Sequence, residues 1–277
     1  MTGYAENPRG VEQLPAASRV ITRKNLSIIK YLILLLMAMC LVLEIIAIVL
    51  GASTGNIFAE FQHFLDNQFH ALATFIVVLG IMMLVVVMGG CIGIMLENMS
   101  TVGIFIVVYT MLIILEIIIV ISTFSLIRNT DSLLGTRMER AFLNFYDDRI
   151  SHRSVNHMQQ RLQCCGFKNY SDWYNWPHHD DFESSVPMSC FASPQYEVPF
   201  EVGCFDRMSE LIGYLLNVLA SGTIVAIIFQ AICVISAVVF LIQLRSYRKH
   251  ETLQRSTGAF PPSVFGLETI PEEKTPI

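Results

Sequence analysis

Leu162-Gln-Cys-Cys-Gly-Phe167 is the stretch that decides the fold, because it places two adjacent cysteines in the only long polar region of the chain. Neighbouring cysteines do not sensibly bond each other, and Gly166 allows the backbone to turn sharply beside them. Each therefore needs a partner further along, and the same polar region offers Cys190 and Cys204. Two disulfides that start from these adjacent cysteines would hold a small, loop-rich domain together on the oxidising side of a membrane.

The composition around this stretch indicates a membrane protein. The 277 residues are 53% hydrophobic and 15% charged, and their mean hydropathy is +0.55. Soluble domains carry about a quarter of their residues as charged side chains. The net charge of -5 is mild and argues against nucleic acid as a partner.

Four apolar runs are each about long enough to cross a bilayer of roughly 30 Å, which predicts an all-α protein with four transmembrane helices. The first run is longer than the core of a cleaved signal peptide. The predicted regions are a tail (1–25), a first span (26–50), a small outer loop (51–70), a second span (71–96), an inner turn (97–100), a third span (101–126), a large outer loop (127–210), a fourth span with an extramembrane extension (211–244), and a proline-rich tail (245–277) that we expect to be disordered.

The distribution of basic residues predicts the orientation. Arg23, Lys24 and Lys30 crowd the start of the first span, and Arg245 and Arg248 follow the fourth. The loop 51–70 has no lysine or arginine. The positive-inside rule therefore places both termini in the cytosol and both larger loops outside.

The large loop is predicted to be helical at its flanks. Apolar residues recur at three- and four-residue steps over 132–163, which suits two helices joined near Asp147-Asp148. Residues 204–219 repeat the pattern. These helices would extend the third and fourth spans and carry a cysteine-rich head.

These features resemble the tetraspanin family over nearly the whole chain. The layout of spans and loops, the Cys164-Cys165-Gly166 triplet, and the segments Pro187-Met188-Ser189-Cys190 and Gly203-Cys204 are similar to family motifs. Four cysteines can pair in three ways. The pairing that joins the adjacent cysteines is disfavoured, and the sequence does not distinguish between the other two. The resemblance implies the disulfides Cys164–Cys204 and Cys165–Cys190.

The resemblance also implies a function. Tetraspanins are scaffolds that bind other integral membrane proteins laterally, including other tetraspanins or copies of themselves, and organise their clustering or trafficking. The expected location is the plasma membrane, with endosomal membrane as the alternative.

Aromatic residues in the head are candidates for partner binding, because aromatics dominate interface hot spots. The alternative is that several of them, Trp173 and Phe191 above all, fill the head's own core. The candidates are Trp173, Tyr174, Trp176, Phe182, Tyr196 and Phe200.

Glu44, Glu116 and Gln230 are polar residues inside the predicted spans. Glu116 and Gln230 match polar positions of the family, whereas Glu44 departs from it, since the family usually has Asn about where Met37 stands. We favour contacts that tie the helices together. A cavity for a sterol or another lipid between the spans is the second interpretation, and a proton relay is the third.

Two modification sites are predicted. Asn169-Tyr-Ser171 is a glycosylation acceptor pattern on the outer side. Cys91 lies near the inner end of its span and is the best candidate for palmitoylation.

No catalytic arrangement is evident, so we expect a protein that is not an enzyme. The run His178-His179-Asp180-Asp181 does not suit a metal site, because contiguous ligands rarely converge. The intramembrane carboxyls motivate an alternative function, a small oligomeric channel or transporter. A claudin-like junction protein fits less well, because its large outer loop should come first.

Overall fold

The computed structural model describes residues 23–175, 186–193 and 198–256. Every regular element within these ranges is helical. The elements are α1 (Arg23–Glu60), α2 (Asn67–Met95), α3 (Met99–Leu143), α4 (Arg149–Leu162), α5 (Asp172–Asn175), η1 (Met188–Cys190) and α6 (Cys204–Ser256).

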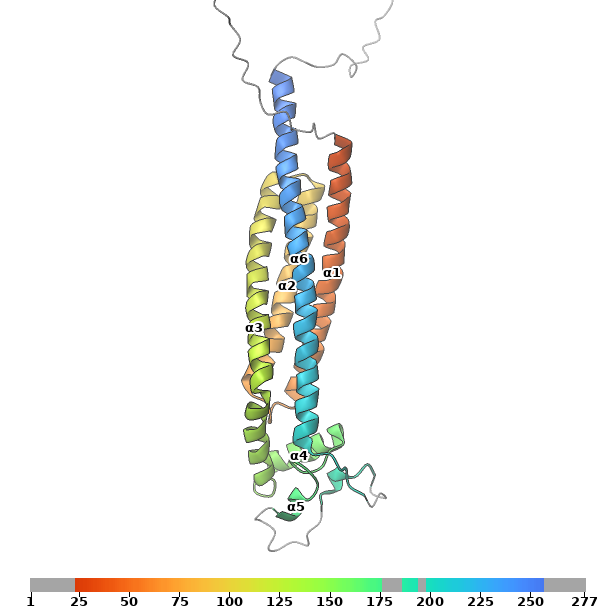
Figure 1. Cartoon of the computed structure of the whole chain (residues 1–277), viewed down its shortest axis with the longest axis vertical. Helices are drawn as coiled ribbons and strands as arrows, with labels where there is room; N and C mark the ends of the chain where they lie inside the picture. The colour runs from red at the N-terminus through yellow and green to blue at the C-terminus, as the bar shows by residue number, and fades with distance from the viewer. Residues whose placement is uncertain (1–22, 176–185, 194–197, 257–277) are drawn as a thin grey trace, which may run out of the picture.

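Four long helices form an antiparallel bundle, and α4 and α5 lie at one end of it (Figure 1). α1 packs against α2 and α6, and α3 packs against the same two helices. All four are long and apolar enough to cross a membrane, with mean hydropathy of 2.9 to 3.1 in their most apolar windows. Large apolar side chains such as Phe75, Ile118 and Ile228 are exposed on the outside of the bundle, where lipid would cover them. The predicted class, an all-α membrane protein with four transmembrane helices, is confirmed.

The helices are longer than the predicted spans. At 1.5 Å per residue, the 45 residues of α3 and the 53 residues of α6 extend about 68 Å and 80 Å, more than twice the thickness of the hydrocarbon core. α3 ends at Leu143 and α4 begins at Arg149, so the helices are separated where the break near Asp147-Asp148 is expected. α1 continues to Glu60, so only residues 61–66 of the small loop separate α1 from α2.

One prediction about the C-terminal tail is wrong. Residues 245–256 are not disordered but continue α6 to Ser256. These twelve positions contain neither glycine nor proline, and the first helix-breaking residue, Gly258, comes just beyond them. The remainder of the tail, 257–277, lies outside the described residues.

Buried apolar side chains form two clusters. One lies inside the bundle toward the end that carries the start of α1, and its large members include Met37, Met83, Tyr109 and Phe240. The other lies toward the opposite end and joins the small loop to the head, which we define as residues 144–203. Because the second cluster crosses from the bundle into the head, the head is packed onto the helices rather than tethered to them.

At the end opposite the head, basic residues hold the turn between α2 and α3. Nζ of Lys30 donates to the carbonyl of Met95 at 2.8 Å and to Oε1 of Glu97 at 2.9 Å. Nη2 of Arg248 donates to the carbonyl of Glu97 at 2.7 Å. Glu97 has a φ of 53°, a left-handed conformation that non-glycine residues rarely adopt. Cations from α1 and α6 thus fasten the turn that joins the other two helices.

Candidate functional site

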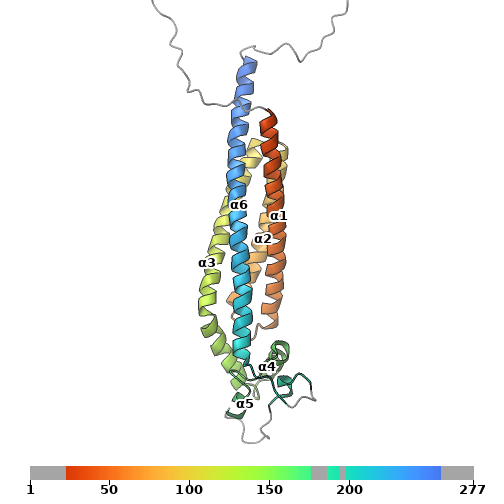
Figure 2. The same ribbon diagram turned by 45° about the vertical axis from the view of Figure 1, so that its right-hand side comes forward.

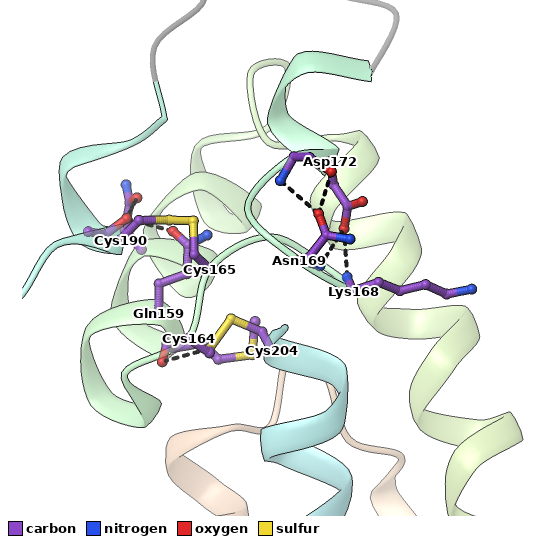
Figure 3. The surroundings of a disulfide bond; sticks show 12 residues. Gln159, Cys164, Cys165, Lys168, Asn169, Asp172, Cys190 and Cys204 are labelled. Atoms are coloured by element: carbon purple, nitrogen blue, oxygen red, sulfur yellow. Dashed lines mark hydrogen bonds between the residues drawn. A yellow bond between two sulfur atoms is a disulfide. The ribbon is translucent and has the colours of Figure 1, made fainter. Parts of the chain in front are cut away.

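The head is built around two disulfides that start from the adjacent residues Cys164 and Cys165 (Figure 3). Cys164 bonds Cys204 at the start of α6, with their Cα atoms 4.9 Å apart. Cys165 bonds Cys190 at the end of η1, with their Cα atoms 5.0 Å apart. This is the pairing that the family resemblance implies. The two bonds tie the end of α4 to α6 and to η1, elements that are distant in the sequence.

Glycine is required at two positions beside these disulfides. Gly166 has a φ of 72°, and a Cβ there would lie 1.9 Å from the carbonyl oxygen of Asn169. A Cβ on Gly203 would lie 2.1 Å from the carbonyl oxygen of Lys168. Between them, the amide of Cys204 donates to the carbonyl of Gly166 at 3.0 Å. No other residue type would allow the chain to pass so closely between the two disulfides.

Ser189 joins η1 to α4. Its hydroxyl lies 2.6 Å from Oδ1 of Asn156 and 2.6 Å from Oε1 of Gln159, and Ser189 and Gln159 are both buried. A buried polar group needs such a partner, because an unsatisfied one costs about 1–3 kcal/mol. The serine before Cys190 therefore positions that cysteine against α4.

Trp173 belongs to the core of the head, which is the alternative that the sequence left open for this residue, and not to a partner-binding surface. Only 2% of its surface is exposed. Its ring packs edge-on against Phe145 with centroids 4.7 Å apart, and it also contacts Phe142 at 5.9 Å. The sequence contains no periodic pattern around this tryptophan, so burial could not be separated from exposure there.

The other aromatic candidates have different surroundings. Tyr174 is half exposed, whereas Phe200 and Phe191 are partly buried against the head cluster. Trp176, Phe182 and Tyr196 lie outside the described residues, as does the run 178–181.

A cleft of about 450 Å³ opens between α4, η1 and the turn that joins α3 to α4. Tyr146 and Met188 line it and are 55% and 63% exposed, so large apolar side chains flank the opening. The remaining lining residues are Phe145, His152, Asn156, Gln160, Pro187 and Ser189. Sequence reasoning missed Tyr146 and Met188, because it considered only aromatic residues between Cys165 and Cys204.

The head rests on the small loop. α4 lies across the end of the bundle beneath α1 (Figure 2), where Oε1 of Glu60 accepts hydrogen bonds from Nε2 of His157 at 2.9 Å and from Nε of Arg161 at 3.1 Å. Nearby, Asp66 pairs with Arg137 of α3 at 3.2 Å. None of these pairs was predicted, because each joins residues more than 70 positions apart.

Asp148 caps the start of α4. Its carboxylate accepts hydrogen bonds from the hydroxyl and the amide of Ser151 and from the amide of Ile150. These bonds, with that from the Ser151 hydroxyl foremost, hold the pKa of the Asp148 carboxyl below its ordinary value. The cap fixes the direction in which α4 leaves α3.

Asn169 is exposed on the turn that follows Cys165 and Gly166. Its Oδ1 accepts from the amide of Ser171 at 2.8 Å and from the hydroxyl of Ser171. Asp172 holds the same turn, since its Oδ2 accepts from the amides of Lys168 at 2.6 Å and Asn169 at 3.1 Å (Figure 3). Glycosylation of Asn169 stays a prediction, at a site that solvent can reach.

The intramembrane polar residues come together inside the bundle. Nε2 of Gln230 on α6 donates to Oε1 of Glu44 on α1 at 2.8 Å. Glu44 and Glu116 line one cavity of about 20 Å³, which has room for about one water molecule. All three residues are buried. The polar contact between the spans is therefore present, and Glu44 is the residue that α1 contributes to it. A sterol does not fit in this cavity, so an intramembrane lipid, which stays a prediction, would have to bind elsewhere.

Cys91 is partly buried in the last turns of α2, and its Sγ lies 4.0 Å from Sδ of Met37 on α1. Its palmitoylation stays a prediction. Within the described ranges, no group of three or more His, Cys, Asp or Glu residues could hold a metal ion.

Four membrane-spanning helices and a disulfide-bonded head inserted before the last of them define a class of multi-pass membrane protein. The model of the Tetraspanin family matches residues 29–243, most of the chain, and the chain belongs to this family.

Curated relatives agree with this assignment. The chain is 24% identical to mouse leukocyte surface antigen CD53 over 52% of its own length and 59% of that protein's length. It is 23% identical to the 23 kDa integral membrane protein of Schistosoma japonicum, over 76% of this chain and 89% of that protein. It is 25% identical to Tetraspanin-33 of Xenopus laevis, over 50% and 54% respectively. The match therefore spans less than two thirds of CD53 and Tetraspanin-33.

Proposed function

We propose that this tetraspanin is a non-enzymatic scaffold that binds other integral membrane proteins laterally and organises their clustering or trafficking. The observation that carries the proposal is the cleft flanked by Tyr146 and Met188. Exposed aromatic and methionine side chains are enriched where protein interfaces form.

The construction of the head supports the same function. The disulfide Cys165–Cys190 and the Ser189 contacts hold η1 against α4, two sides of the cleft, before any partner binds. A preorganised surface loses less conformational entropy on binding than a flexible one does. Tyr174 presents a second exposed aromatic surface on α5, outside the cleft.

Proximity labelling from a biotin ligase fused to a chain end, followed by co-purification in mild detergent, would identify the partners. We expect Tyr146→Ala and Met188→Ala to reduce recovery of the main partner, with Tyr174→Ala as the matched surface variant. If Tyr174→Ala alone has the effect, recognition lies on α5. Unchanged recovery in all three variants, and in a chimera that exchanges residues 166–203, would contradict recognition by the head.

We propose the plasma membrane as the location, with both termini in the cytosol. The name of the mouse relative describes that protein as a leukocyte surface antigen, which supports a surface location. Surface biotinylation combined with protease protection of terminal tags tests both statements. Tags cleaved from outside intact cells would contradict the orientation, and confinement to endosomes would contradict the location.

A small channel or transporter is the second function that Glu44 and Glu116 suggest. Their cavity of about 20 Å³ lies within a bundle whose buried neighbours include the apolar side chains of Leu79 and Ile76. An ion pathway needs a continuous polar lining, so this arrangement supports the scaffold instead. Ion flux through purified protein in liposomes would revive the channel hypothesis.

A further inference from the structure

A groove of about 710 Å³ runs between α2 and α3 on the outside of the bundle, in the half nearer the head. Its floor is apolar and buried, with Leu72, Leu79 and Leu126 each at most 8% exposed. Its volume lies in the range of sites that hold small organic ligands. The lining residues are Gln68, Ala71, Leu72, Phe75, Val78, Leu79, Leu115, Ile118, Ile119, Ser122, Ser125, Leu126, Asn129 and Leu133.

A second hollow begins where this groove ends. Leu133 lines the groove and also lines a cleft of about 720 Å³ beneath the head. Most residues that line the cleft are polar or charged, whereas most that line the groove are apolar. Its other lining residues are Gln62, His63, Ser132, Thr136, Arg137, Arg140, Ala141, Asn144, Asp148 and Ser151. The two hollows therefore meet at Leu133 and follow α3 one after the other, the first lined mainly by apolar side chains and the second mainly by polar ones.

The charges in the polar cleft favour an anion. Arg137 and Arg140 lie one helical turn apart on α3. Arg137 also pairs with Asp66, whereas the guanidinium of Arg140 makes no hydrogen bond or ion pair with any side chain in the described ranges. Among the described residues, Asp148 is the only carboxylate that lines the cleft, and its oxygens already accept from Ser151 and Ile150.

We propose that this paired groove and cleft bind one lipid of the head-side leaflet whose headgroup carries a negative charge. The hydrocarbon chains lie in the groove between α2 and α3, and the anionic headgroup binds Arg140 with Arg137 beside it. Charge complementarity selects this occupant, because a sterol has one uncharged hydroxyl and would leave the guanidinium of Arg140 without a charged partner. The inference concerns lipid recognition and is independent of the scaffold function.

The test uses the full-length chain in phosphatidylcholine vesicles and two lipid probes that differ in one group. The anionic probe is a sulfated galactosylceramide with a photoactivatable diazirine in its acyl chain, and the neutral probe is the same molecule without the sulfate. After irradiation, crosslinked peptides are mapped by mass spectrometry. We expect the anionic probe to label residues 68–79 and 115–133 about fivefold to tenfold more than the neutral probe.

Two variants, each with a matched control, distinguish binding of the headgroup in the cleft from binding of the hydrocarbon chains in the groove. Arg140→Gln removes the charge and should reduce labelling by the anionic probe to the level of the neutral one, whereas Arg153→Gln on α4 should not. Ser122→Phe fills the groove and should reduce labelling by both probes. Its control is Thr110→Phe, at an exposed residue of the same helix outside the groove, whose hydroxyl, like that of Ser122, donates to the carbonyl four residues earlier. Unchanged thermal unfolding of each variant shows that it is folded.

Three results would overturn the proposal. Equal labelling by both probes with no effect of Arg140→Gln would exclude recognition of the charge. Crosslinks spread evenly over all four long helices would indicate ordinary surrounding lipid. Loss of labelling on addition of excess cholesterol, or in native membranes where a partner helix occupies the groove, would assign the site to another occupant.

Discussion

Oε1 of Glu44 accepts a 2.8 Å hydrogen bond from Nε2 of Gln230, which joins α1 to α6 across 186 residues of sequence. The bond lies inside the bundle, where both residues are only 1% exposed. Polar contacts between membrane helices typically contribute about 0.6–2 kcal/mol. This contact gives α1 and α6 a specific position relative to each other that their apolar surfaces alone would not specify.

Glu44→Leu should lower the thermal unfolding midpoint in mild detergent by an amount equivalent to about 0.6–2 kcal/mol, because it leaves the Gln230 amide without its acceptor. Glu44→Gln keeps an acceptor oxygen and should cost less. In a double-mutant cycle with Gln230→Leu, the double variant should be more stable than the sum of the two single changes predicts. Strict additivity would show that the two side chains do not interact.

Removal of either disulfide should destabilise the head by about 3–4 kcal/mol, since the bonds close segments of 40 and 25 residues. The variants are Cys164→Ser with Cys204→Ser, and Cys165→Ser with Cys190→Ser. Denaturant unfolding followed by tryptophan fluorescence reports on the head, because both tryptophans lie in it. Alkylation of these four cysteines in unreduced protein from native membranes would contradict the fold.

Acid should weaken the attachment of α4 to α3. The pKa of Asp148 is lower in the folded protein than in the unfolded chain, so its contribution to stability is present above the unfolded value of about 3.9. That contribution is lost as the pH falls through the lower, folded value. Asp148→Asn can still cap the helix but does not titrate.

Thermal unfolding of the head, measured between pH 7 and about pH 2.5, tests this expectation. The midpoint of the wild type should fall more steeply below pH 4 than that of Asp148→Asn. Parallel curves for the two proteins would show that the Asp148 cap does not contribute to acid sensitivity.

Asn169 should carry an N-linked glycan. Expression in mammalian cells should give a protein whose apparent mass falls on treatment with an endoglycosidase, and Asn169→Gln and Ser171→Ala should abolish that difference. Ser171→Thr keeps the acceptor pattern and should retain it. The chain has two further acceptor patterns, Asn25-Leu-Ser27 and Asn98-Met-Ser100, both on the inner side in the predicted orientation. Enzyme-sensitive mass in the Asn169→Gln variant would point to one of these and would contradict the orientation.

Glu60 should hold α4 against the end of α1. Glu60→Lys places a positive charge beside Arg161 and His157, so the amides of α4 should exchange hydrogen for deuterium faster than in the wild type. Adding Arg161→Glu restores an opposite pair and should recover part of the protection, within the 0.2–1 kcal/mol typical of an exposed ion pair. Glu139→Lys, on the exposed face of α3, is the control. Equal effects of Glu60→Lys and Glu139→Lys would show that the change reflects net charge alone.

Basic residues near the ends of the long helices contribute more to the structure than the sequence predicts. Lys30 and Arg248 are part of the charge pattern that predicts the orientation, and both also bind the turn at Glu97. A count of charges along the chain predicts only their side of the membrane. Their partners lie 67 and 151 residues away, and only the folded bundle shows these contacts.

By itself, the sequence determined the four helices, the break between α3 and α4, and the position of the disulfide-bonded head. These features depend on local properties: the length of an apolar run, the repeat of apolar residues, and the presence of cysteine or glycine in the chain. The tertiary structure alone decided that Trp173 is buried, that Tyr146 and Met188 flank a cleft, and that Glu44 meets Gln230. It also decided that the groove between α2 and α3 meets, at Leu133, a cleft lined by Arg140. Each of these depends on which distant elements pack together, and side-chain packing, unlike hydropathy, is not a property of any one segment.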